Sequence, residues 1–218
     1  MLPRHIGIMK KTFRRLHRLS AVVLGVFTVL HLANHVVAVG GIASHIAVMS
    51  ALRVLYRNPV SEIILVLAVL IQIVTGFSGL RNAFKRNGVA RVQALSGLVL
   101  AVFLFGHTVA VIGARIALGL DTNFYFAATV FNFAWLPWFF IPYYFLAILS
   151  VAVHVGAALY WRSKSTKTEM SAGMRRWFLI APIIIAVMIF IPIVLAFTGA
   201  FYPIHLPAEY TAPYAALQ

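Results

Sequence analysis

The sequence predicts an all-α integral membrane protein with five transmembrane helices, its N-terminus inside and its C-terminus outside. Three observations lead to this prediction. Of the 218 residues, 62% are hydrophobic and only 10% are charged, whereas a soluble chain carries about 25% charged residues. Five apolar runs are each about 20 residues long, the length that crosses a bilayer as a helix. The basic residues fall mainly in alternate loops between those runs, as they do in multi-pass proteins.

Each apolar run is expected to be helical, because lipid cannot satisfy free backbone groups. The first run follows a basic stretch, but it is too long for the apolar core of a signal peptide and lacks a clear cleavage site, so we interpret it as a span. No remaining segment is long enough for a soluble domain, and residues 1–218 are predicted to form one domain. The predicted spans are Leu19–Val39, Val60–Leu80, Val92–Ala114, Phe139–Tyr160 and Trp177–Phe197.

The basic residues predict the orientation. The N-terminal segment and the loops after the second and fourth spans hold 15 of the 18 Lys and Arg residues, and short loops rich in these residues stay on the cytoplasmic or matrix side. This distribution explains the formal net charge of +14 without a nucleic-acid partner. Only Arg53, Arg57 and Arg115 fall on the outer side.

Two further segments lie at the predicted membrane interfaces. The segment Gly41–Asn58 is too polar to span, and the spacing of its apolar residues predicts a short amphipathic helix on the outer face, with Ser44 as a cap. His45 in this helix and His17 in the N-terminal basic stretch are expected to be solvated polar residues.

Histidine is the ionisable residue type that recurs inside the spans. Placing such a group inside a bilayer costs free energy, so it usually has a structural or functional role. At about 1.5 Å of rise per residue, His31, His35 and His107 form an outer layer about 18–24 Å from the inner end of their spans. His154 lies only about 9 Å in, and Gln72 about 12 Å in. The spans have almost no carboxylate, which argues against a proton pump, and the chain has no cysteine for metal–thiolate sites or disulfides.

Two imidazoles at one depth on different helices suit the axial ligation of a haem, with apolar residues around the porphyrin. The third span carries Gly97, Gly106 and Gly113, and small residues let helices make room for such a group. Zinc usually takes three or four ligands with carboxylates behind them, which favours haem over zinc here. The alternative is that the histidines make hydrogen bonds between helices.

Four motifs in order along residues 13–160 carry a family resemblance: FRRLHRLSAVVLGVFTVLH at 13–31, SHIAVM at 44–49 followed by Tyr56 and Glu62, SGLVLAVFLFGH at 96–107, and LSVAVH at 149–154. With these motifs the chain resembles the five-span cytochrome b anchor subunit of succinate dehydrogenase and fumarate reductase. The segment HLANH at 31–35 also resembles a related group of membrane proteins that includes a fungal mitochondrial adaptor linked to lipid handling.

The family resemblance implies specific ligands. In its two-haem members, spans one and three supply one ligand pair, which matches His31 and His107, and spans two and four supply the other. His154 matches half of that second pair, while the span-two position falls on or near Gln72, which is not a normal haem ligand. One b-type haem is therefore expected, with two as the alternative. Depth alone slightly favours His35 over His31, and the resemblance selects His31.

The remaining candidate contacts lie around this haem. His35, His154, Gln72 and His17 are candidates for a second haem layer or for quinone contacts. On the basic inner face, Arg14, Arg18 and Arg81 are candidate partners of haem propionates, with anionic lipid as the default interpretation.

The leading functional hypothesis is a b-type cytochrome that exchanges electrons with quinone in a bacterial inner membrane or a mitochondrial membrane. It would anchor a flavoprotein and iron–sulfur partner on its basic inner face. The alternatives are a stand-alone haem membrane protein without a dehydrogenase partner, and a haem-free membrane anchor or lipid-linked adaptor.

Overall fold

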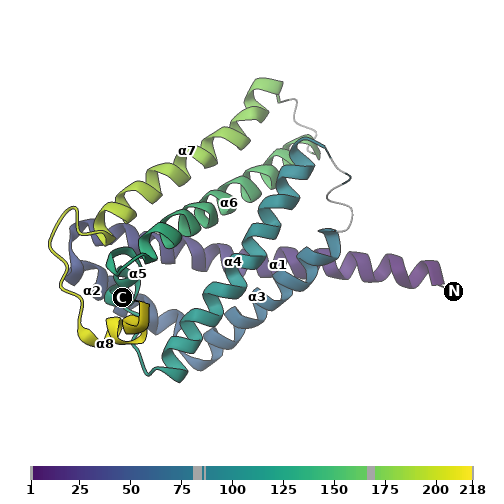
Figure 1. The fold of residues 1–218 in the computed structure, drawn as a ribbon. Helices are drawn as coiled ribbons and strands as arrows, with labels where there is room; N and C mark the ends of the chain where they lie inside the picture. The colour runs from purple at the N-terminus through teal and green to yellow at the C-terminus, as the bar shows by residue number, and fades with distance from the viewer. Residues whose placement is uncertain (1, 81–84, 86, 166–169, 218) are drawn as a thin grey trace.

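The computed structural model describes residues 2–80, 85, 87–165 and 170–217, and every regular element in these residues is helical (Figure 1). The elements in chain order are α1 (Leu2–Val37), η1 (Ala38–Gly40), α2 (Ile42–Tyr56), α3 (Pro59–Leu80), α4 (Val89–Ala117), α5 (Phe124–Asn132), α6 (Leu136–Ser165), α7 (Ala172–Phe197), α8 (Ala208–Thr211) and η2 (Ala212–Leu217).

Five helices within the described residues are long and apolar enough to cross a membrane, which confirms the five predicted spans. The helices extend past the predicted span boundaries, most clearly in α1, whose N-terminal end projects from the bundle in Figure 1. Backbone hydrogen bonding continues into the polar flanks because nothing in the sequence there stops a helix. The protein is therefore a multi-pass membrane protein.

The five long helices are arranged as a closed ring in which each one packs against two neighbours. Helix α1 packs against α3 and α7, helix α4 packs against α3 and α6, and α6 packs against α7. Helices on opposite sides of the ring, such as α1 with α4 or α6, do not pack against each other in the part of the chain that the structure describes. Only side chains reach across the interior of the ring.

Small residues occupy the contacts between neighbouring helices. Such residues allow close backbone approach in a membrane, where van der Waals packing rather than the hydrophobic effect holds helices together. Helices α6 and α7 approach closely at Gly156, where a Cβ atom would collide with the carbonyl oxygen of Phe178. Buried alanines at these contacts include Ala68, Ala101, Ala147, Ala157 and Ala186.

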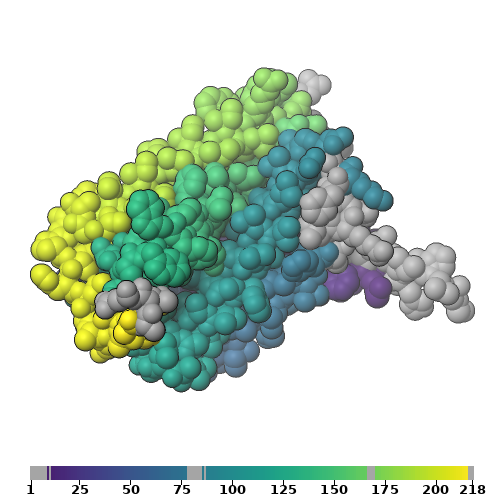
Figure 2. All heavy atoms as spheres, in the orientation of Figure 1, coloured from purple at the N-terminus to yellow at the C-terminus, as the bar shows by residue number. Residues whose placement is uncertain are grey.

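A packed cap closes the end of the ring that is remote from the N-terminus. We call this the cap end; it comprises α2, α5 and residues 198–217, of which residues 198–215 appear in yellow in Figure 2. Its core contains the fully buried rings of Phe124 and Phe197. The Tyr202 hydroxyl donates a hydrogen bond of 2.6 Å to the Ala38 carbonyl, and the Asn132 amide donates one of 2.7 Å to the Phe197 carbonyl. The first bond fixes the C-terminal segment against η1, and the second fixes α5 against the end of α7.

The short helix α2 confirms one prediction and corrects two. A helix does form within Gly41–Asn58, but it begins at Ile42 after Gly41, whose φ of 110° favours glycine. Ser44 is not its cap; the Ser44 hydroxyl donates to the Gly40 carbonyl at 3.1 Å. The prediction that His45 is solvated is wrong, because α2 packs against α1, α3 and α5, and His45 is only 1% exposed.

Candidate functional site

The cap-end layer of the ring interior brings His31 of α1 opposite His107 of α4. Their ring centroids lie 6.2 Å apart. With metal–imidazole bonds of about 2 Å, two imidazoles that share one metal atom have centroids about 6 Å apart. Each ring stacks on the phenylalanine one turn before it, His31 on Phe27 at 5.3 Å and His107 on Phe103 at 5.1 Å. The two helices therefore present equivalent Phe–His pairs across the ring.

His35 faces a different set of groups. Its Nε2 lies 3.2 Å from His31 Nε2, and its ring contacts are to His31, His45 and Phe197. His31, not His35, makes the ring contact with His107. The helix direction explains the difference, because one turn moves His35 beneath the cap, where α2 and α7 surround it. The geometry thus favours His31 as the partner of His107.

At the end of the ring opposite the cap, a second layer, which we call the basic-end layer, pairs His154 of α6 with His17 of α1 at a centroid separation of 6.5 Å. Sequence reasoning expected Gln72 at this level and His17 at the solvated interface. In the structure His17 is half-buried and faces the interior. Gln72 instead donates hydrogen bonds to the His17 carbonyl at 2.7 Å and to the Ser20 hydroxyl at 3.1 Å. Gln72 thus supports the turn of α1 that carries His17.

Hydrogen bonds hold both rings of this layer by their Nδ1 atoms. His154 Nδ1 lies 3.0 Å from the Gln93 carbonyl, which can only accept, so Nδ1 carries the proton. His17 Nδ1 lies 2.8 Å from the Thr75 hydroxyl, which itself donates to the Ile71 carbonyl. Each Nε2 then keeps its lone pair, and no hydrogen bond to either Nε2 occurs in the described residues. A histidine that ligates a metal is held in this way by its other nitrogen.

The imidazoles of both pairs keep accessible surface although five helices surround them. His17, His31, His107 and His154 are all only partly buried. The fully buried large side chains lie in the cap and not at these two layers. In the described residues, helices on opposite sides of the ring do not pack together, so only side chains meet across its interior.

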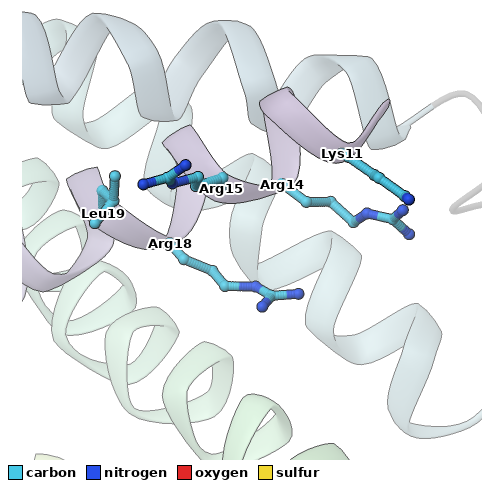
Figure 3. Close-up of a pocket in the computed structure, with 5 residues that line it drawn as sticks. All are labelled: Lys11, Arg14, Arg15, Arg18 and Leu19. Carbon is cyan, nitrogen blue, oxygen red and sulfur yellow. The ribbon is translucent and has the colours of Figure 1, made fainter. Parts of the chain in front are cut away.

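A basic surface pocket of about 420 Å³ lies along α1 at the end of the bundle opposite the cap, which we call the basic end. Figure 3 shows Arg14, Arg18 and Lys11 extending from this helix, with Arg15 and Leu19 completing the lining. The arginines are exposed. They can bind phosphate or carboxylate groups. The third predicted propionate partner, Arg81, lies outside the described residues.

The arginines at the cap end are paired with acids. Arg53 and Arg57 lie 2.8 and 2.9 Å from the Asp121 carboxylate, and Arg115 makes two hydrogen bonds to Glu62. Burial alone would raise the pKa of Asp121, but the hydrogen bonds and charges of the two arginines outweigh it and hold that pKa below its ordinary value. Within the described residues, the α1 cations of the basic end form no ion pair. The two ends therefore differ in unpaired positive charge.

Sequence reasoning missed two groups beside the cap-end layer. Asn34 is 4% exposed and lies 3.1 Å from His45 Nε2. The spacing His31, Asn34, His35 places all three on one helix face, and an amide inside a span was the available signal. Nothing in the sequence placed His45 beside them, because the α1–α2 turn at Gly41 brings it there.

No family model, no curated protein and no solved structure matches this chain. In the part of the chain that the structure describes, no cluster of three or more His, Cys, Asp or Glu side chains is arranged to hold a metal ion.

Proposed function

We propose that this protein is a membrane b-type cytochrome whose haem is held between α1 and α4 by His31 and His107. The observation that carries the proposal is their 6.2 Å separation across a ring in which α1 and α4 do not pack against each other. Two neutral imidazoles with stacked phenylalanines suit low-spin haem iron, and the surrounding apolar helices suit a porphyrin. When bound, the haem supplies one-electron redox chemistry.

A second haem at the basic-end layer is supported by a separate observation. His17 and His154 have nearly the same separation as the first pair, 6.5 Å, and both keep an available Nε2. Fourteen residues of α1 separate His17 from His31, which corresponds to about 21 Å along the helix. The sequence predicts a single haem because Gln72, which is not a normal haem ligand, is expected opposite His154. In the structure His17 lies opposite His154 instead, so that reason for a single haem no longer applies. Arg14 and Arg18 lie within one turn of His17 and are suitable partners for propionates.

The electron partners are proposed from the resemblance and from charge. We propose quinone as the membrane-soluble partner. A flavoprotein and iron–sulfur assembly would dock on the basic end, where the exposed Lys and Arg side chains of α1 suit an acidic surface. The same charges support an orientation with the N-terminus inside and the C-terminus outside, in a bacterial inner or a mitochondrial membrane. Reporters fused after Gln218 and at Lys85 test the orientation, and both on one side of the membrane would contradict it.

The visible spectrum of the purified protein is the decisive experiment. We expect a Soret band and a bis-histidine spectrum, and the pyridine haemochrome assay then counts haems per chain. Absence of haem after expression with haem supplied would favour the haem-free anchor or lipid-linked adaptor. Co-purification of a flavoprotein separates the dehydrogenase anchor from a stand-alone haem protein.

Ligand variants locate each haem. His107→Ala should abolish the cap-end haem, because α4 has no other histidine. His31→Ala should do the same, while His35→Ala, inserted into the membrane at equal levels, should retain it. If His35→Ala loses the haem and His31→Ala keeps it, the ligand lies one turn further along α1. His17→Ala should remove only a basic-end haem and leave the cap-end spectrum intact.

A further inference from the structure

One face of α1 changes from basic to aliphatic along its length. The basic part lines the surface pocket of about 420 Å³ at the basic end of the bundle. We call its four cations the basic cradle; they are Lys11, Arg14, Arg15 and Arg18. Leu19 completes the lining, and further along the helix Val22, Val26 and Val29 are 66%, 61% and 68% exposed. We call these four apolar residues the aliphatic stripe.

Helix geometry turns this face away from the two histidine layers. Arg15, Arg18 and Val22 recur every three or four residues, so they share one side of α1. His17 lies on the other side, where its ring faces His154 across the interior of the ring. The basic cradle and the aliphatic stripe therefore face the surroundings of the bundle.

The length of the helix places the cradle at the level of the lipid headgroups. The apolar segment Lys11–Gly40 has 30 residues, which corresponds to about 45 Å of helix. The hydrocarbon core of a bilayer is only about 30 Å thick, and headgroups extend it to about 40–45 Å. Figure 3 shows Arg14 and Arg18 extending toward the Lys11 end of the helix. This is the direction in which long basic side chains reach the polar interface.

The cradle concentrates like charges that an anion can neutralise. Lys11 and Arg15 are four residues apart, and so are Arg14 and Arg18, a spacing at which like charges on a helix repel each other. All four side chains are exposed. Guanidinium groups match phosphate oxygens with two parallel hydrogen bonds, and an ammonium group adds a point charge. A phosphate group bound here would relieve the repulsion.

We propose that the basic cradle and the aliphatic stripe together form a binding site for an anionic phospholipid. The headgroup phosphate binds between the cations, and an acyl chain lies along Leu19, Val22 and Val26. The continuity of the two surfaces favours a lipid, because a soluble phosphate compound or an acidic protein surface would contact the cations alone. The inference does not depend on haem. It gives a role to Lys11 and Arg15, which are not among the proposed propionate partners.

Lipid binding to the purified wild-type protein in detergent, counted by native mass spectrometry, tests the ligand class. The probes are phosphatidylglycerol, phosphatidylcholine with the same acyl chains, and glycerol 3-phosphate, which has no acyl chain. We expect one phosphatidylglycerol to bind more tightly than phosphatidylcholine, and glycerol 3-phosphate at equal concentration should not displace it. Equal affinity for the two lipids, or displacement by glycerol 3-phosphate, would overturn the proposal, and neither result requires a variant to fold.

A double variant tests the residues. Lys11→Gln combined with Arg15→Gln should weaken phosphatidylglycerol binding about thirtyfold through the loss of two positive charges, and phosphatidylcholine binding should not change. Arg175→Gln combined with Arg176→Gln is the matched control, because it removes two charges from the start of α7, outside the pocket. The control should keep the tightest phosphatidylglycerol site. Equal weakening in both double variants would show a response to total charge and would overturn the proposal.

Two further measurements separate this site from the proposed function. Both double variants should keep their haem, because neither changes a proposed iron ligand or propionate partner. Absence of haem from the wild-type protein would refute the cytochrome function and leave the lipid result standing. Loss of a co-purifying flavoprotein from the Lys11→Gln, Arg15→Gln variant, with unchanged phosphatidylglycerol binding, would assign this face to protein docking and overturn the lipid proposal.

Discussion

Replacing Gly97 with alanine should displace His154 and selectively disturb the basic-end layer. A Cβ atom at Gly97 would lie 3.0 Å from His154 Cε1 and 3.3 Å from His154 Nδ1. Carbon atoms in contact prefer about 3.5–4.0 Å, so the imidazole must move by about 0.5 Å or more. The hydrogen bond from His154 Nδ1 to the Gln93 carbonyl, now 3.0 Å, would lengthen to about 3.5 Å, beyond the normal range.

The net energetic cost follows from three terms. Losing the hydrogen bond costs about 1 kcal/mol, and over-packing costs about 1–3 kcal/mol. Helix propensity returns up to about 1 kcal/mol when alanine replaces glycine. The net destabilisation of Gly97→Ala should therefore be about 1–3 kcal/mol. Gly113→Ala is the matched control on the same helix, because a Cβ atom at Gly113 would have no neighbouring atom within 4 Å, and it should be neutral or slightly stabilising.

Thermal unfolding in detergent, followed by circular dichroism, measures the difference between the two variants. The pyridine haemochrome assay then reports whether haem is lost from Gly97→Ala and not from Gly113→Ala. If both variants unfold at the same temperature with the same haem content, the close packing of Gly97 against His154 does not affect stability, and the reasoning is refuted.

Three further predictions concern the cap and the α6–α7 contact. Asp121→Asn should lower the unfolding free energy by at most about 1 kcal/mol at low salt, because the ion pairs of Asp121 with Arg53 and Arg57 are partly exposed. Chemical unfolding at two salt concentrations measures this loss, and a loss independent of salt would argue against an ionic origin. The folded-state pKa of His45 is about 4, against an ordinary 6.5. Its neutral form therefore contributes its full stabilisation above pH 6.5, and the unfolding free energy of the wild-type protein should fall by about 3 kcal/mol relative to His45→Phe as the pH falls from 6.5 to 4. Parallel pH profiles of unfolding free energy for the two proteins would contradict this. Gly156→Ala should reduce the melting temperature, since its Cβ meets a backbone carbonyl of α7 that cannot rotate away, and an unchanged melting temperature would show that the two helices separate without cost.

The membrane fold could be predicted from composition and length alone. An apolar run of about 20 residues has few alternatives to a helix in lipid, because every backbone group must be satisfied within the segment. All five spans were found for this reason, and so was the short helix α2. The cap end could not be foreseen from the same pattern, because its core joins Ala38, Phe124 and Phe197, which lie far apart in the sequence.

The sequence also identified His31, His35, His107 and His154 as the residues to examine, because polar side chains inside a span are costly and need a reason. Only the tertiary structure decided how they pair. Depth along a helix gives the level of a side chain but not the side of the bundle that it faces, and Gln72 was therefore assigned to His154 in place of His17. The rotation and tilt of each helix, fixed by packing against its two neighbours in the ring, determine which imidazoles meet across the interior.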